Sequence, residues 1–170
     1  MAQFHLHTDD HASSTVPSLS IQLEHGGVDK LRMVMRIMGK AFSSLYGESW
    51  NEHQCRSMLS LPGTCLMIAY CEQQPCGFAI TRNASDEEEL LMIAVSPRYQ
   101  KKGVGSVMLR RLIDDAVEND ISAIFLEVRS NNPAQGLYQK LGFQKIGQRV
   151  NYYTGDNNEK FDAITYKKSL

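Results

Sequence analysis

The sequence predicts a protein of the α/β (α+β) class, in which helices flank a mixed β-sheet. Strands are expected in neighbouring pairs joined by short turns, and such pairs form antiparallel hairpins. A strand–helix–strand segment at residues 88–128 is expected to cross over between parallel strands. The expected order is β-α-α-β-β-β-α-β-α-β-β, and 170 residues suffice for one domain.

The chain divides at residue 18 into a polar leading segment and one domain. Residues 1–18 contain His5, His7 and His11 and a Ser/Thr-rich stretch, but no apolar segment typical of a signal peptide. We expect a flexible tail in which the His-x-His pair is solvated and holds no metal. The domain is expected to span residues 19–170.

Apolar periodicity predicts the elements of the first half of the domain. Residues 19–24 alternate apolar and polar side chains, which indicates a strand. Helical spacing over residues 28–42 predicts a first helix, and a second short helix is expected over residues 50–59. Leu61-Pro62-Gly63 then interrupts the chain. Strands follow at residues 64–70, 75–82 and 88–95, the first two joined by a turn at residues 72–74.

The clearest helix spans residues 104–118, where apolar side chains form one continuous stripe. After the next strand, Asn131 or Asn132 could cap a short helix that starts with proline at its first turn. The remaining expected elements are a strand at residues 123–128, a short helix from Pro133 that ends at Gly142, and hairpin strands at residues 143–153 and 161–167 around a turn at residues 154–158.

Composition excludes several classes of function. The formal net charge of −1 argues against a general nucleic-acid binder, which requires a basic excess to displace counterions from phosphates. No segment approaches the roughly 20 apolar residues of a membrane span. The four cysteines are Cys55, Cys65, Cys71 and Cys76. Because no pair has the CxxC spacing of a zinc site, we interpret them as reduced thiols of a cytoplasmic protein.

A basic loop with two glycines joins a buried strand to the clearest helix. Gly103 and Gly105 let the backbone approach a ligand closely, and the free N–H groups of the first helical turn form an anion site. Arg98, Lys101 and Lys102 add positive charge there. The pattern is neither a Walker A motif nor a dinucleotide-binding fingerprint. The alternative is an ordinary strand-to-helix connection with a solvated basic rim.

The segment Gln100-Lys101-Lys102-Gly103-Val104-Gly105 resembles the Gln/Arg-x-x-Gly-x-Gly/Ala pyrophosphate loop of the GNAT superfamily of N-acetyltransferases. The resemblance extends from about residue 19 to the C-terminus and is strongest over residues 85–167. It implies acetyl-coenzyme A as the cofactor, and a mostly antiparallel sheet with a splayed central strand pair. The cofactor-binding residues that it implies are Ile93, Ala94, Val95, Gln100, Lys101, Lys102, Gly103, Val104, Gly105, Ser106, Asn131 and Tyr138.

Within that superfamily, three stretches are most similar to the ribosomal-protein-alanine N-acetyltransferases (RimI-type). They are Leu-Glu-Val-Arg-Ser-Asn at residues 126–131, Leu-Tyr-x-x-Leu-Gly-Phe at residues 137–143, and Arg-x-Asn-Tyr-Tyr at residues 149–153 with Asp-Ala-Ile at residues 162–164. The family pattern has one more residue between Arg and Ser-Asn, so the loop after Arg129 is one residue short here. The resemblance implies transfer of acetyl to a protein N-terminal α-amine, with a ribosomal protein as the partner.

Glu127 and Tyr138 are the catalytic residues that this resemblance implies. Attack of an amine on a thioester needs a base for the amine proton and an acid for the leaving thiolate. Burial raises the pKa of a carboxylate, which suits Glu127 to accept a proton, directly or through water. Tyr138 would protonate or orient the sulfur. The alternatives are that Glu127 faces solvent or pairs with Arg129, and that Tyr138 is only a core aromatic.

Five residues are candidates for the acceptor side of the site, namely Tyr46, Trp50, Glu89, Tyr152 and Tyr153. The paired tyrosines fall in the hairpin that helps to close the peptide cleft in related N-terminal acetyltransferases. Tyr46 and Trp50 lie between the first two helices, where a plain core role is equally open for Trp50. Glu89 could attract a cationic amine, although acidic runs are more often solvated surface.

Two other functions stay open from the sequence. Small-molecule amine or lysine acetyltransferases use the same fold, and the paired tyrosines favour a protein N-terminus over these acceptors. A non-catalytic acetyl-coenzyme A sensor would keep the loop, but would not need Glu127 and Tyr138. Neither a membrane nor a nucleic acid is expected as a partner.

Overall fold

A computed structural model describes residues 19–42, 49–155 and 158–170 of the chain. The strands are β1 (Ile21–Gly26), β2 (Thr64–Cys71), β3 (Gln74–Ala84), β4 (Glu87–Val95), β5 (Ala123–Arg129), β6 (Gln144–Thr154) and β7 (Lys160–Ser169). The helices are the 3-10 turns η1 (Val28–Lys30) and η3 (Pro97–Tyr99), and the α-helices α1 (Leu31–Ala41), α2 (Glu52–Leu59), α3 (Val104–Glu118) and α4 (Gln135–Lys140).

The strands form one sheet in the order β1-β2-β3-β4-β5-β7-β6. Within the described chain, β4 and β5 run parallel and all other neighbours run antiparallel. The parallel pair is the one that α3 connects, as a crossover requires. These pairings confirm the mixed, mostly antiparallel sheet and the order of elements that the sequence predicts.

Some element boundaries differ from the prediction, one because of pairing with a distant strand and one because of a local helix cap. The predicted first strand at residues 19–24 lies two residues too early, because its pairing with β2 continues to Gly26. The second helix starts at Glu52 rather than at residue 50. Asn51 and Gln54 form a capping box there, with backbone-to-side-chain bonds of 2.8 and 2.9 Å. The predicted tail at residues 1–18, Tyr46 and part of the last turn lie outside the described residues.

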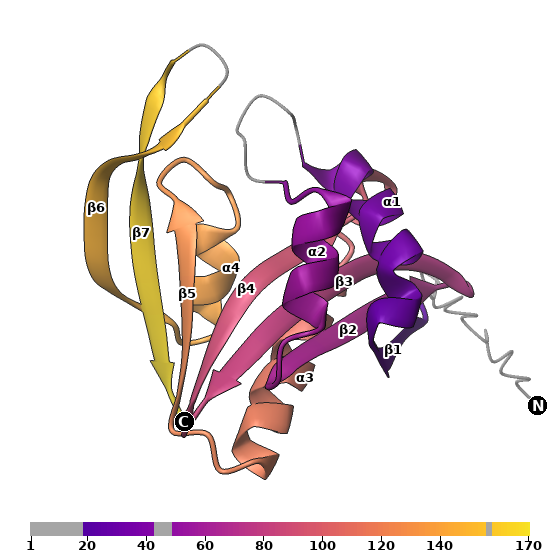
Figure 1. The fold of residues 1–170 in the computed structure, drawn as a ribbon. Helices are drawn as coiled ribbons and strands as arrows, with labels where there is room; N and C mark the ends of the chain where they lie inside the picture. Colours follow the sequence, from indigo (N-terminus) through magenta and orange to yellow (C-terminus); the bar gives the residue numbers. More distant parts are fainter. Residues whose placement is uncertain (1–18, 43–48, 156–157) are drawn as a thin grey trace, which may run out of the picture.

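Helices cover both faces of the sheet (Figure 1). On one face, α1 packs its apolar stripe, including Val34 and Ile37, against Phe78 and Ile80 of β3. On the other face, Met108, Leu109 and Leu112 of α3 are buried in one cluster with Met67 and Ala79. Side chains alternate between the faces along a strand, so β3 contributes to both clusters. Burying each large apolar side chain stabilises the fold by roughly 1.5–3 kcal/mol.

The two parallel strands separate along their length, as Figure 1 shows. Pairing joins Glu87–Leu90 of β4 to residues 123–126 of β5 and stops there. Beyond this point, no described strand pairs with the edge of β4 from Leu91 to Val95 that faces β5. A register shift between β3 and β4 at Leu91 accompanies the separation, since a bulge bends a strand. The splayed central pair is therefore confirmed.

Candidate active site

The loop after β4 ends in a glycine that begins α3. Gly103 has a φ of +87° and is the N-terminal cap of the helix. The first hydrogen bond of the helix runs from Val107 N to Gly103 O at 3.0 Å. The N–H groups of Val104, Gly105 and Ser106 precede this bond, so they have no partner within the helix. Three donors and the positive end of the helix dipole therefore converge at this point.

The two loop glycines serve different purposes. A Cβ on Gly103 would meet no atom within 4 Å, so the space in front of it is open. Its positive φ is the conformation that favours glycine over other residues. A Cβ on Gly105 would lie 3.4 Å from Leu137 Cδ2, so this glycine allows α3 and α4 to approach each other. Of these two glycines, only Gly103 faces open space.

Basic side chains surround the loop and are held by its aromatic residue. Tyr99 is buried, and Arg98 and Lys102 lie 5.5 and 5.9 Å from its ring centroid. Cation–π contacts of this kind hold both cations beside the loop. Gln100 Nε2 donates to the carbonyl of Val95 at 2.9 Å and thereby ties the loop to the end of β4. The result is a rigid, positively charged edge beside the start of α3.

A cavity of about 390 Å³ opens where β4 and β5 separate. It brings together five of the residues that the sequence singles out, namely Trp50, Ile93, Glu127, Tyr138 and Tyr153. The other described lining residues are Phe42, Ser49, Gln54, Leu90, Leu91, Met92, Leu126, Val128 and Asn132. The cavity thus combines apolar side chains with polar groups, among them one carboxylate and two phenols.

Glu127 is half-buried in this cavity and forms an ion pair. Arg149 Nε donates to Glu127 Oε2 at 3.0 Å, and Arg149 Nη2 donates to the same oxygen. This hydrogen bonding to Glu127 raises the pKa of Arg149. The guanidinium also lies 3.9 Å from the ring centroid of Tyr152. The sequence suggested Arg129 as an alternative partner, whereas the observed partner comes from β6.

Tyr138 is at once a core aromatic and a residue of the cavity wall. It is 5% exposed, and its ring centroid lies 6.0 Å from that of Phe143 and 6.2 Å from that of Tyr166. The hydroxyl of Tyr166 donates to Gln135 at 3.0 Å and accepts from Gln139 at 3.2 Å, which fixes α4 against β7. Packing therefore positions Tyr138, and the two interpretations of this residue are compatible.

The loop after β5 places Asn132, rather than Asn131, in the cavity wall. Asn131 is exposed, and its Oδ1 accepts a hydrogen bond from Arg129. Asn132 Oδ1 accepts from Ala134 N at 2.9 Å at the start of α4. Sequence reasoning considered Asn132 only as a helix cap. The length of the loop is the signal that could have identified it. Because the loop after Arg129 is one residue shorter than the family pattern, Asn132 takes the place in the cavity wall where Asn131 was expected.

Several predicted site residues do not line the cavity. Glu89 is exposed on β4, and Tyr152 is 51% exposed with its ring against Tyr153 at 5.1 Å. The Ala94 side chain is buried in the core beneath α1, so only its backbone faces the gap between the strands. Tyr46 lies outside the described residues. The acceptor role of Tyr46, Glu89 and Tyr152 and the cofactor-binding role of Ala94 stay predictions.

Asp162 is a supporting residue that sequence reasoning did not assign a role. Its Oδ1 accepts from Asn151 N at 2.9 Å, and its Oδ2 accepts from Gln148 Nε2 at 2.5 Å. These bonds lower the pKa of Asp162. They hold an irregular segment of β6 between Arg149 and Tyr153, where Asn151 has a φ of +57°. Asp162 thereby supports the segment of β6 that carries Arg149 and Tyr153.

The described residues contain no group of three or more His, Cys, Asp or Glu side chains that could hold a metal ion. All four cysteines are free thiols, and Cys65 is exposed while the other three are buried. In the described part of the chain, no helix has the length and apolar character needed to cross a bilayer.

The sequence is similar to those of curated bacterial N-acetyltransferases. The ribosomal protein bS18-alanine N-acetyltransferase of Escherichia coli K12 is 45% identical over 89 residues, which are 51% of this chain and 59% of that protein. The enzyme of the same name from Haemophilus influenzae is 38% identical over 91 residues, covering 54% and 62% of the two chains. The alignments thus span about three fifths of these curated relatives.

The fold comparison extends over more of the chain. The crystal structure of the ribosomal-protein-S18-alanine N-acetyltransferase from Escherichia coli superposes with a TM-score of 0.82 and 28% identity. The match covers 89% of this chain and 94% of that one. A family model described as the acetyltransferase (GNAT) family matches residues 31–143, about two thirds of the sequence. The chain therefore belongs to the GNAT family of acetyltransferases.

Proposed function

We propose that this protein transfers an acetyl group from acetyl-coenzyme A to the N-terminal α-amine of a protein. The acceptor is the N-terminal alanine of a ribosomal protein, which implies a cytoplasmic enzyme. The observation that carries the proposal is the cavity between β4 and β5, which Glu127 and Tyr138 both line. The names of the relatives support the same acceptor.

The start of α3 fits the diphosphate of the cofactor. The N–H groups of Val104, Gly105 and Ser106 would hold the phosphate oxygens, with Lys101 and Lys102 as counter-charges. Each charge-assisted hydrogen bond would contribute roughly 1.5–3 kcal/mol. A neutral strand-to-helix connection would need neither the open space at Gly103 nor this basic edge. When bound, acetyl-coenzyme A supplies an acyl group activated as a thioester.

The unpaired edge of β4 fits an extended, amide-containing chain such as pantetheine. Residues Leu91 to Val95 present backbone N–H and C=O groups that no neighbouring strand uses on that side. Buried backbone groups need partners, so an amide chain lying in the gap would supply them. A backbone N–H near Ile93 would also polarise the carbonyl that is attacked. Asn132 stands beside the same gap and would orient the arm.

Two side chains would carry the protons. The Glu127 carboxylate would take the proton of the acceptor ammonium, directly or through water, and Tyr138 would give a proton to the leaving sulfur. Each such transfer typically contributes 10²–10⁴-fold to the rate. Both side chains line one cavity and arise from different elements, β5 and α4. A sensor that only binds the cofactor would need neither, which argues against that alternative.

Aromatic residues would enclose the acceptor on two sides. Trp50 lines the cavity from the segment before α2, and Tyr153 lines it from β6. Tyr152 and Arg149 stand next to Tyr153 at the exposed rim. The end of an extended peptide would contact both the cavity walls and the rim. A compact small molecule inside the cavity would make no contact with the rim. This arrangement favours a protein N-terminus over a free amine.

The test is an acetyl-transfer assay with peptides that differ only in their first residue. We expect the peptide beginning with alanine to be acetylated with the highest kcat/KM, and free lysine and polyamines to be poor acceptors. An N-terminally blocked peptide with internal lysines is the control for side-chain acetylation. If lysine or polyamines gave an equal or higher kcat/KM, the acceptor would be a small-molecule amine or a lysine and not a protein N-terminus.

A further inference from the structure

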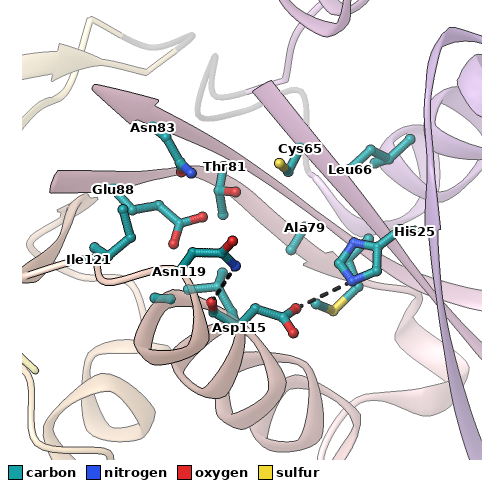
Figure 2. A pocket seen from close by; sticks show the side chains of 13 residues that line it. His25, Cys65, Leu66, Ala79, Thr81, Asn83, Glu88, Asp115, Asn119 and Ile121 are labelled. Carbon is teal, nitrogen blue, oxygen red and sulfur yellow. Dashed lines mark hydrogen bonds and ion pairs between the residues drawn. The ribbon is translucent and has the colours of Figure 1, made fainter. Parts of the chain in front are cut away.

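We propose that a second cavity, on the α3 face of the sheet, binds a small primary alkylammonium ion. The cavity has a volume of about 160 Å³ and lies between the later turns of α3 and strands β1 to β4 (Figure 2). None of its lining residues also lines the cavity between β4 and β5. The proposal is therefore separate from the acetyl-transfer site and does not rest on the proposed function.

Glu88 is a buried carboxylate without a cationic partner. It lines the cavity at the start of β4 and is only 7% exposed. Among the described residues, no Lys, Arg or His forms an ion pair with it, and the contact that stabilises its charge is the Thr81 hydroxyl. Burial, and to a smaller degree Asp115, raise the pKa of Glu88. A cation in the cavity would supply the missing compensation.

A second acceptor in the same wall also lacks a partner. Asn83 Oδ1 is buried and accepts no hydrogen bond, which is rare for a buried polar atom. Figure 2 shows Asn83, Thr81 and Glu88 close together on one side of the cavity. An ammonium group has three N–H donors, one for each of these oxygen acceptors. The wall thus matches a primary ammonium in both charge and number of hydrogen bonds.

The other carboxylate that lines the cavity, Asp115, already has a cationic partner. Asp115 pairs with Arg111 at 2.7 Å and with His25 at 3.3 Å. Cys65 also lines the cavity, and burial, Glu88 and Asp115 all raise its pKa. An anion would therefore meet like charge here. A neutral ligand would leave Glu88 without a partner, so a cation fits the cavity best.

The remaining wall of the cavity is largely apolar, and the cavity is small. Leu112 and Ala116 of α3, Met67, Ala79 and Ile121 form its walls. An apolar cavity of about 150 Å³ holds benzene, so a ligand here has about six non-hydrogen atoms. An ammonium on a chain of four or five carbons has this size, with the chain against the apolar wall. The described residues form no cluster that could hold a metal ion instead.

The test is calorimetric titration of the full chain with n-butylamine hydrochloride, with 1-butanol as the uncharged probe of equal length. We expect the amine to bind at least tenfold more tightly than the alcohol. Glu88→Gln should weaken amine binding at least tenfold, and Asn83→Ala should weaken it several-fold. Glu87→Gln, at the exposed neighbouring position, is the matched control and should keep wild-type affinity.

Two further experiments distinguish binding in this cavity from binding in the acceptor site. Glu127→Gln, or saturating coenzyme A, should leave amine affinity unchanged, because no residue is shared between the cavities. Displacement of the amine by coenzyme A would place it in the other cavity and overturn the proposal. Equal affinity for amine and alcohol, wild-type affinity in Glu88→Gln, or no binding up to about 50 mM amine would do the same.

Discussion

Arg149 on β6 reaches across β7 to donate two hydrogen bonds to Glu127 on β5. The guanidinium is held from its other side by the ring of Tyr152, so it is fixed between the carboxylate and the exposed rim. A base that must accept a proton needs a defined orientation as well as a suitable charge. We infer that Arg149 positions Glu127.

Arg149→Gln tests this positioning role. We expect kcat/KM for the acceptor peptide to fall at least about tenfold, because both charge-assisted hydrogen bonds from Arg149 to Glu127 are lost. Arg149→Lys should restore part of that loss, since a cation remains near the carboxylate. Coenzyme A affinity should stay unchanged in both variants. Arg110→Gln, on the exposed surface of α3, is the control, and equal kinetics of the two Gln variants would contradict the inference.

Glu127→Gln tests the proposed role of Glu127 as the base. Glutamine keeps the shape of the side chain but has almost no basicity, so we expect kcat at pH 7 to fall by about 10²–10⁴-fold. Cofactor affinity, measured by calorimetry, should change by less than about twofold, because the carboxylate lies away from the start of α3. Unchanged turnover at pH 7 would show that another group, or the solvent, accepts the proton.

Gly103→Asp tests the cofactor site. The substitution puts a negative charge into the open space before the helix N–H groups, and we expect coenzyme A binding to be lost. Gly103→Ala separates this effect from backbone strain, because it adds a side chain at the same positive φ without a charge. Gly39→Asp, at an exposed helical glycine with open space, is the matched control. Wild-type affinity in Gly103→Asp would exclude the loop as the diphosphate site.

Local signals predicted α3 and its loop well. Gly103 marks the start of that helix, and the apolar stripe marks its length. Both signals are local, because helical spacing and the positive φ of a capping residue depend on neighbouring residues only. The motif around Glu127 and the helix with Tyr138 were also recognisable. Their meeting in one cavity follows from the β4–β5 separation, which the family resemblance implied and the residue pattern alone did not.

The sequence pattern did not predict the contacts between residues far apart in the chain, and the reason is physical. Arg149 is 22 residues from Glu127, and a third strand lies between their strands. The start of β1 follows its register with β2, which periodicity within one segment does not set. Asn132 replaces Asn131 in the cavity wall because one residue fewer connects β5 to α4. Each case depends on where a distant element or a loop end lies in space.

Asp162→Ala tests the support of the β6 segment. Losing its bonds to Asn151 and Gln148 should release the irregular backbone that carries Arg149 and Tyr153. We expect KM for the peptide to rise several-fold while coenzyme A affinity stays at the wild-type value. Asp162→Asn should act more weakly, because its carbonyl oxygen still accepts from Asn151 N. An unchanged KM in Asp162→Ala would show that β6 keeps its shape without this residue.

Glu88→Gln tests whether the charge of Glu88 is uncompensated, through the free energy of unfolding. The raised pKa of Glu88 means that the folded chain binds more protons than the unfolded chain between the unfolded and folded pKa values. The free energy of unfolding of the wild type therefore falls as pH rises through that interval, and stays lower above it. Glutamine carries no charge to desolvate, so the variant should be more stable than the wild type near pH 8.

The stability difference should shrink as pH falls below the folded pKa of Glu88 towards 4.5, where the wild-type carboxyl is protonated and resembles the amide. Thermal unfolding from pH 4 to pH 8 measures it, and each kcal/mol corresponds to roughly 2–4 °C for a chain of this size. Glu87→Gln, with an exposed side chain, should show no such trend. A Glu88→Gln variant that unfolds earlier than the wild type at pH 8 would mean that a bound cation or another partner already compensates this carboxylate.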